Sequence, residues 1–268
     1  MRAYRLAYDG TCYRGFQRQP HGQTVEDELF GALADLGVAE GKPEGYAAAG
    51  RTDRGVSALA QTVALAAPEW LTPRALNSRL PASIRAWAHA DVDEGFSARY
   101  DATERVYRYH LYAPADAVDD ARARAACDGL SGRHDFHDLT LDAEGTVRDL
   151  AVSVERDGAF LTFDLRAQGF ARQLVRRVVS LVALVARGER PVSFVDRVLA
   201  PDPLSGADGV PPAPPAGLVL LDVTYPDCSF VVDGEAAASA REVFEERRVD
   251  AATRARTFGT VGDALDVE

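Results

Sequence analysis

Hydrophobic and polar residues alternate along several short stretches of the chain, which is the pattern of strands that bury one face. In residues 105–112 this alternation places Tyr107 and Tyr109 on the same face. A hairpin is predicted over residues 146–166, with its turn at Asp157-Gly158. Further strands are expected at residues 2–8, 46–49, 61–65, 84–92 and 218–225.

Other stretches repeat hydrophobic residues at intervals of three and four, which predicts amphipathic helices. The first follows Thr24, which forms a capping pair with Asp27, and ends at Gly37. A long helix is predicted over residues 170–187, with an apolar stripe made of Leu174, Val178, Leu181 and Val185. Further helices are expected at residues 72–80, 121–130, 193–199 and 238–256, and the Pro- and Gly-rich residues 201–215 form a connector.

The order of these elements is strand, helix, two strands, helix and strand, and it occurs roughly twice. That order is typical of ferredoxin-like units, in which helices cover one face of an antiparallel sheet. The sequence therefore predicts an α+β fold with two ferredoxin-like α/β subdomains, at residues 1–103 and 104–226. An acidic extension, residues 227–268, follows them.

The composition fits substantial hydrophobic cores, since 47% of the 268 residues are hydrophobic and the formal net charge is −11. Only Lys42 among the 30 basic residues is a lysine. An acidic, arginine-rich chain of this kind is typical of proteins from high-salt organisms, in which acidity serves solubility. The alternative is an ordinary acidic enzyme.

Acidity argues against a general nucleic-acid binder, but the arginines are unevenly distributed. Residues 1–24 hold four arginines and one acid, and residues 161–190 hold six arginines and two acids. The guanidinium fork suits phosphate recognition. These two segments are therefore the expected anion-binding parts of the chain.

Several other signals are weak or absent. The longest apolar stretch, residues 178–186, is too short to cross a bilayer, and residues 2–5 do not begin a signal peptide, so we expect a cytoplasmic protein without a membrane partner. His134 and His137 have the spacing of a metal pair, but no suitable cluster accompanies them, so we expect a loop or a helix start and no metal. The three distant cysteines predict no disulfide framework: Cys12, Cys127 and Cys228.

The most distinctive segment is the polar loop Gly50-Arg51-Thr52-Asp53-Arg54-Gly55. Its two glycines allow a sharp turn and a close approach to a ligand. Its two arginines should keep the Asp53 carboxylate ionised, which suits a nucleophile or a base better than a general acid. Taken alone, an aspartate between glycines is more often a turn-forming residue.

Together with Val56-Ser57-Ala58, this loop resembles the active-site segment of the TruA family of tRNA pseudouridine synthases. The resemblance runs from about residue 4 to residue 226 and leaves out only the tail. Many bacterial relatives have a His-His pair where this chain has Arg172-Gln173, which is expected to alter RNA contacts but no catalytic group. The other matching segments follow in family order: Tyr8–Thr11, Gly15–Gln17, Gln23–Leu29, Phe96–Arg99, Arg105–Tyr109, Gly132–Phe136, Phe170–Arg176 and Pro214–Leu218.

The resemblance implies that Asp53 is the nucleophile that isomerises uridine to pseudouridine in the anticodon stem-loop of tRNA, at positions 38, 39 and/or 40. The bond from N1 to the sugar breaks, the base rotates, and C5 is joined to the sugar. Asp53 could attack the sugar, attack the base, or remove a sugar proton, and these routes stay open. No redox step or phosphoryl transfer occurs, so no cofactor is expected.

The resemblance also implies roles for three further residues. Tyr107 would stack on the target base, and its hydroxyl could help to remove the C5 proton. Arg176 would pair with Asp53, and Arg51 would displace the target nucleotide or hold its phosphate. Further candidates for phosphate contacts are Arg14, Arg18, Arg54 and Arg172, of which Arg172 is expected on the same helix face as Arg176. The structural alternatives are core packing for Tyr107 and solvated surface positions for the arginines.

Finally, the resemblance implies a homodimer across which the tRNA lies, and a cleft between two sheets that holds Asp53, Tyr107 and Arg176. Two other functions stay open. One is an RNA-binding module without catalysis, which would not need the intact Gly-Arg-Thr-Asp segment. The other is a glycosidase, which needs two carboxyl groups, whereas only Asp53 lies in a convincing site.

Overall fold

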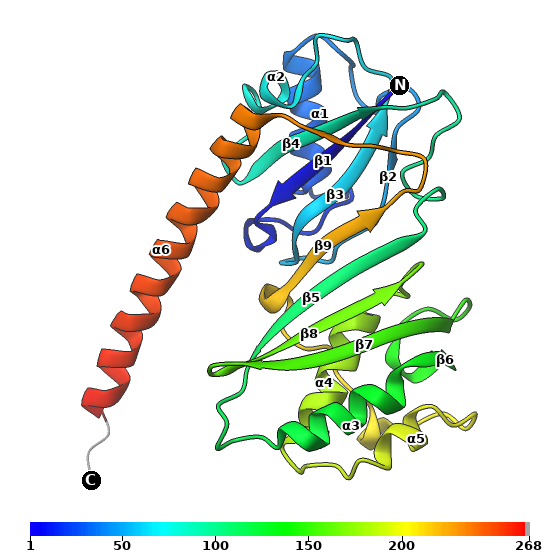
Figure 1. Ribbon diagram of the computed structural model, residues 1–268, viewed down its shortest axis with the longest axis vertical. Coiled ribbons are helices and arrows are strands. Elements are labelled where there is room, and N and C mark those ends of the chain that lie inside the picture. The colour runs from blue at the N-terminus through cyan, green and yellow to red at the C-terminus, as the bar shows by residue number, and fades with distance from the viewer. Residues whose placement is uncertain (266–268) are drawn as a thin grey trace.

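The computed structural model describes residues 1–265, which form a ten-stranded sheet with helices at its two ends (Figure 1). β2 (Ala47–Ala48) pairs with β3 beside the main path of the sheet. The other strands lie in the order β10 (Val231–Val232), β4 (Ile84–Asp91), β1 (Arg2–Tyr8), β3 (Ser57–Leu65), β9 (Leu218–Thr224), β5 (Glu104–Tyr112), β8 (Phe160–Ala167), β7 (Val147–Asp157) and β6 (Gly132–Asp135).

The predicted α+β class is confirmed, but the expectation of two separate sheets is wrong. β9 comes late in the sequence and lies between β3 and β5, so it joins the two halves into one sheet. It runs parallel to β3, where Ala58 pairs with Leu220, and antiparallel to β5, where Leu220 pairs with Tyr107. All other neighbouring strands are antiparallel. The division near residue 103 stays a prediction.

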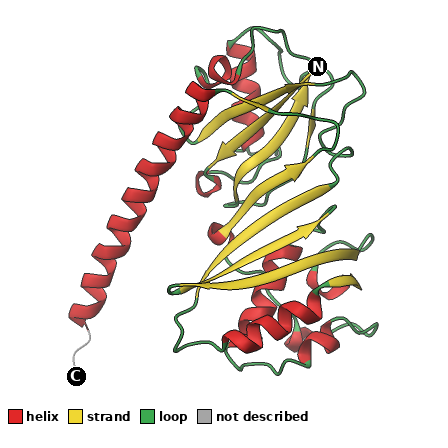
Figure 2. Ribbon diagram, in the orientation of Figure 1, coloured by secondary structure: helices red, strands yellow, loops and turns green. Residues whose placement is uncertain are grey.

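The helices lie in two groups. α1 (Val25–Asp35) and α2 (Pro73–Asn77) accompany the half that contains β1, β3 and β4, and α3 (Asp120–Leu130), α4 (Leu174–Ala186) and α5 (Phe194–Val198) accompany the half that contains β5, β8 and β7. Figure 2 shows that the middle of the sheet, where β9 meets β5, lies between these groups. The centre of the sheet therefore lies between two ends that carry helices.

Local sequence explains where the two main helices begin. The side chain and backbone of Thr24 exchange hydrogen bonds with Asp27, so the predicted capping pair of α1 is confirmed. The predicted apolar stripe of α4 is fully buried, and each of its side chains stabilises the fold by about 1.5–3 kcal/mol. However, α4 begins at Leu174, because Gln173 has a left-handed backbone with φ of 62°. Arg172 therefore lies outside the helix, and the expectation that it shares a helix face with Arg176 is wrong.

Some boundaries differ from the sequence-based expectation. β2 covers only two residues of the expected strand 46–49, and β3 starts earlier than expected, at Ser57. The short strands β6 and β10 were not predicted. His134 lies in β6, and His137 begins a short 3-10 turn.

Within residues 1–265, no cluster of three or more His, Cys, Asp or Glu side chains could hold a metal ion, and no helix is long and apolar enough to cross a membrane.

α6 (Gly234–Leu265) is longer than the helix expected at residues 238–256, and most of it stands away from the rest of the chain (Figure 1). Its first turns pack against β4 and α2 and bury Ala236 and Ala240. Arg247 forms an ion pair with Asp9. Every residue from Arg248 to Leu265 is exposed.

Candidate active site

A large cleft crosses the middle of the sheet between the two helix groups, and it has a volume of about 2610 Å³. Pockets for small molecules are typically about 300–1,000 Å³. Twelve basic and five acidic residues line the cleft, although the whole chain carries a net charge of −11. The cleft therefore suits a large anionic ligand.

Asp53 lies in the loop between β2 and β3, and this loop is fixed from both sides. The Phe16 amide donates to the Thr52 carbonyl at 3.0 Å, and the hydroxyls of Thr52 and Tyr8 share a hydrogen bond of 2.7 Å. Gly55 takes the turn conformation expected of it, with φ of 81°, and a Cβ there would lie 2.9 Å from Pro215. Only a glycine therefore allows the loop to turn this closely against its neighbours.

The loop brings Asp53 to Arg176, which is distant in the sequence. The Nη1 atom of Arg176 lies 3.3 Å from the Asp53 carboxylate, and its Nε donates to the Ala213 carbonyl at 2.6 Å. The Asp53 side chain is 32% exposed and the Arg176 side chain is 12% exposed. The carboxylate is thus held by a partly buried cation and still reaches the cleft.

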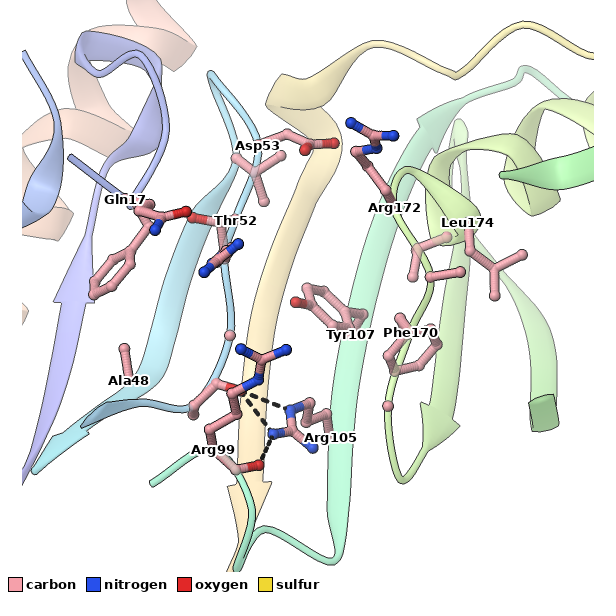
Figure 3. A pocket seen from close by; sticks show the side chains of 18 of the residues that line it. Gln17, Ala48, Thr52, Asp53, Arg99, Arg105, Tyr107, Phe170, Arg172 and Leu174 are labelled. Carbon is pink, nitrogen blue, oxygen red and sulfur yellow. Dashed lines mark hydrogen bonds between the residues drawn. The ribbon is translucent and has the colours of Figure 1, made fainter. Parts of the chain in front are cut away.

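Tyr107 projects from β5 between the Asp53 loop and Phe170 (Figure 3). The rings of Tyr107 and Phe170 meet edge to face, with their centroids 5.1 Å apart. Tyr107 lines the cleft although it is only 8% exposed. Burial raises the pKa of Tyr107 to about 12; the positive charge of Arg105 opposes this shift and the negative charge of Asp53 adds to it. Its hydroxyl is therefore neutral at neutral pH.

Arg105 is a site residue to which sequence reasoning assigned no role. It is 8% exposed and donates to the Ala49 carbonyl through Nε at 3.0 Å and Nη2 at 2.7 Å (Figure 3). It also donates to the carbonyls of Arg99, at 2.8 Å, and Gln168. One side chain thereby ties together the segment before the Asp53 loop, the turn at Arg99 and the segment before Phe170. A signal existed in the sequence, since Arg105 falls on the same strand face as Tyr107.

All the arginines predicted for the site line the cleft, but their environments differ. Arg18 donates to Asp27 at 2.9 Å, and Arg172 lies 3.4 Å from Asp142, so their charges are partly neutralised. In residues 1–265, no carboxylate lies within 4.0 Å of the guanidinium groups of Arg14, Arg51, Arg54 or Arg99, and all four side chains are exposed.

Away from the cleft, many arginines are neutralised. The arginines that pair there with carboxylates include Arg2 with Asp91, Arg5 with Asp222, Arg108 with Asp164, Arg156 with Asp120 and Arg190 with Asp208. The contrast concentrates uncompensated positive charge in the cleft. This focuses a favourable potential for an anion there, despite the acidity of the chain.

Comparison with known proteins identifies relatives along nearly the whole chain. The family model described as "tRNA pseudouridine synthase" matches residues 126–226. The chain is 62% identical to "tRNA pseudouridine synthase A" of Natronomonas pharaonis over 263 residues, which cover 97% of this chain and 98% of that protein. It is 58% identical to the protein of the same name from Haloarcula marismortui, over 99% of this chain and 100% of that protein. A third relative with this name, from Methanothrix thermoacetophila, is 42% identical over 86% of this chain and 85% of that protein.

Proposed function

Because the chain belongs to the TruA family of tRNA pseudouridine synthases, it is an isomerase that converts uridine in tRNA to pseudouridine, and we propose that Asp53 is its nucleophile. The observation that carries this proposal is the ion pair between Asp53 and Arg176 at 3.3 Å, inside a basic cleft. The arginine orients the carboxylate, as an attacking group requires. The similarity to haloarchaeal proteins supports adaptation to high salt.

The substrate site is proposed to be the anticodon stem-loop of tRNA. The cleft, at about 2610 Å³, is much larger than a typical small-molecule pocket, and unpaired arginines lie on both sides of Asp53 in the sequence, at Arg51 and Arg54. The target uridine must leave its stack, at a cost of a few kcal/mol. Arg51 is proposed to stabilise the displaced nucleotide through its phosphate, and Arg14, Arg18, Arg54 and Arg172 are proposed to contact neighbouring phosphates.

Tyr107 is proposed to stack on the extruded uracil. Its ring is held by Phe170 and lines the cleft beside the Asp53 loop. Stacking on one aromatic side chain contributes about 1–3 kcal/mol per base. The raised pKa of Tyr107 argues against its hydroxyl as the base that takes the C5 proton, since a neutral phenol is a weak proton acceptor. The hydroxyl is better suited to donate a hydrogen bond.

The product is an isomer of uridine and has the same composition. The C5 proton is lost, a proton is gained at N1, and no electrons are exchanged with another group, so we propose catalysis without a cofactor. We also propose that the enzyme works in the cytoplasm as a homodimer with the tRNA lying across both copies. Sedimentation of the protein with and without tRNA tests the dimer.

Substitution of the carboxylate tests the main proposal. Asp53→Asn should abolish the release of tritium from tRNA labelled at uridine C5, while tRNA binding persists. Asp149→Asn is the matched control, because Asp149 is an exposed acid that lines the same cleft. Wild-type turnover by Asp53→Asn would show that Asp53 is not the nucleophile. An RNA-binding module without catalysis would release no tritium even in the wild-type chain.

The three routes open to Asp53 can be separated by isotopic substitution. Deuterium at C2′ of the target uridine slows the reaction if the carboxylate removes that sugar proton. A rate that is unchanged by C2′ deuterium leaves attack on the sugar or attack on the base. Trapping the covalent adduct of Asp53 and sequencing the attached nucleoside then identifies the atom that was attacked.

A further inference from the structure

Tyr100 is unusually exposed for an aromatic residue at the wall of a cleft. This residue is 75% exposed, more than any other large hydrophobic residue in the part of the chain that the structure describes. It lines the same cleft as Asp53 and Tyr107. An aromatic ring left in solvent at this position provides a free face for a planar ligand.

Arg99 lies next to this ring and completes the arrangement. Its guanidinium carbon is 5.3 Å from the centroid of the Tyr100 ring, within the range of a cation–π contact. Arg99 is exposed, lines the cleft and has no carboxylate partner within residues 1–265. One aromatic face and one uncompensated cation therefore lie together.

The turn that carries these two residues is fixed in place. The Tyr100 and Asp101 amides both donate to the Ser97 carbonyl, at 3.2 and 3.0 Å, and the Asp101 carboxylate accepts from the Ser97 amide at 2.8 Å. The Arg99 carbonyl accepts from Arg105 at 2.8 Å, which ties the turn to the segment before the Asp53 loop. The backbone that carries the ring and the cation is thus fixed, which lowers the entropic cost of ordering this turn on binding.

We infer that Arg99 and Tyr100 form a second nucleotide-binding site in the cleft, for an unpaired nucleotide of the tRNA other than the target uridine. Tyr100 stacks on the base of this nucleotide, and Arg99 binds its phosphate. Unpaired bases stack on exposed aromatic side chains in many RNA complexes. In Figure 3, Arg99 and Asp53 lie on opposite sides of Tyr107. The inferred site is therefore distinct from the position proposed for the reacting base, on Tyr107. The inference rests on the proposed function only in taking this cleft as the tRNA site.

Substitution at Tyr100 tests the stacking contact. We expect Tyr100→Ala to weaken the binding of an anticodon stem-loop RNA by about 5- to 150-fold, the range that loss of one stacking partner gives. Tyr100→Phe keeps the ring and should bind within about twofold of wild type. The turnover number at saturating RNA should stay unchanged, because the reacting base lies elsewhere. Tyr112→Ala is the control, since Tyr112 is 64% exposed but does not line the cleft.

A double-mutant cycle identifies the nucleotide. Each unpaired nucleotide of the RNA is replaced in turn by an abasic one, and binding is measured with wild type and with Tyr100→Ala. At one position the two losses should be strongly non-additive, because both changes remove the same contact. Additive losses at every position would overturn the inference. Dissociation of Tyr100→Ala into monomers, without coupling to any nucleotide, would show that the ring is a subunit contact instead.

The same experiments separate this inference from the proposed role of Asp53. If Asp53 is not the nucleophile, Asp53→Asn keeps its turnover while the coupling at Tyr100 remains. If the second nucleotide site does not exist, Tyr100→Ala binds RNA as wild type does while Asp53→Asn is still inactive.

Discussion

Arg176 Nη1 lies 3.3 Å from the Asp53 carboxylate, and Nε of the same side chain donates to the Ala213 carbonyl at 2.6 Å. The guanidinium is therefore held by the connector before β9 while it orients the carboxylate. A lysine provides a charge but cannot make both contacts in this geometry.

This relationship predicts a graded effect of substitution at Arg176. Arg176→Lys should keep part of the turnover, and Arg176→Gln should lose at least tenfold more, because it removes the charge beside Asp53. Tritium release under single-turnover conditions measures both. Arg187→Gln, at the far end of α4 and exposed, is the control and should react as wild type does. Equal activity of all three variants would contradict the orienting role.

Arg105 predicts a large effect on stability. Arg105→Ala removes the donors to the carbonyls of Ala49, Arg99 and Gln168. The bonds to Ala49 are buried, whereas those to Arg99 and Gln168 are only partly buried. A buried group left without a partner costs about 1–3 kcal/mol, so the free energy of unfolding should fall by at least about that amount. Urea titration monitored by circular dichroism measures this.

The same strand supplies the control for Arg105. Arg108 pairs with Asp164 on the opposite face of β5 and is 38% exposed, so Arg108→Ala should cost at most about 1 kcal/mol. If Arg105→Ala were no more costly than Arg108→Ala, the carbonyls would find water or other donors, and Arg105 would not hold the three segments together.

These two arginines illustrate what the sequence could predict. Alternation in β5 identified a strand and its buried face, because side-chain direction is a local property. The partners of Arg105 could not be predicted, since Ala49 and Gln168 come from distant segments. Two sheets were predicted instead of the single sheet found for the same reason. β9 pairs with β3 and β5, and β3 and β5 lie far from it in the sequence. The pairing of Asp53 with Arg176 was expected only from the family resemblance, since no local pattern connects them.

Tyr107 predicts a specific loss of stability at high pH. Its pKa is raised by burial to about 12 in the folded chain, from about 10 for an unperturbed tyrosine. Between these values the unfolded chain has released the proton and the folded chain has not, so the free energy of unfolding falls as pH rises from about 10 towards about 12. The loss is about 1.4 kcal/mol per pH unit for this one proton.

Tyr107→Phe removes this proton while it keeps the ring. The slope of the unfolding free energy against pH should become less steep by one proton between about pH 10 and 12, and tRNA affinity at neutral pH should stay close to wild type. Urea titrations across this range measure the slope. An unchanged slope would mean that Tyr107 ionises freely in the folded chain.

The unpaired arginines of the cleft predict how binding depends on salt. Arg51→Gln and Arg54→Gln should weaken tRNA binding more at about 0.5 M than at about 3 M salt, because counterions screen phosphate contacts. In the molar range, shape fit and stacking should carry more of the affinity, so the logarithm of the binding constant should depend only weakly on salt concentration. Arg79→Gln, which lies outside the cleft, is the control. If the binding constant for tRNA fell steeply with salt across the molar range, phosphate contacts rather than shape fit and stacking would carry most of the affinity there.

The fold is expected to be stable without the outer part of α6. All residues from Arg248 to Leu265 are exposed, whereas the buried contacts of this helix lie at Ala236 and Ala240. Deletion of residues 251–268 should therefore leave the midpoint of thermal unfolding within about 2 °C of wild type, since it removes little buried apolar surface. Ala240→Glu is the contrasting variant and should lower the midpoint, because a charge would enter the contact with β4. A large loss of stability in the deletion variant alone would show that the outer helix is covered in solution, and sedimentation would identify a second copy as the cover.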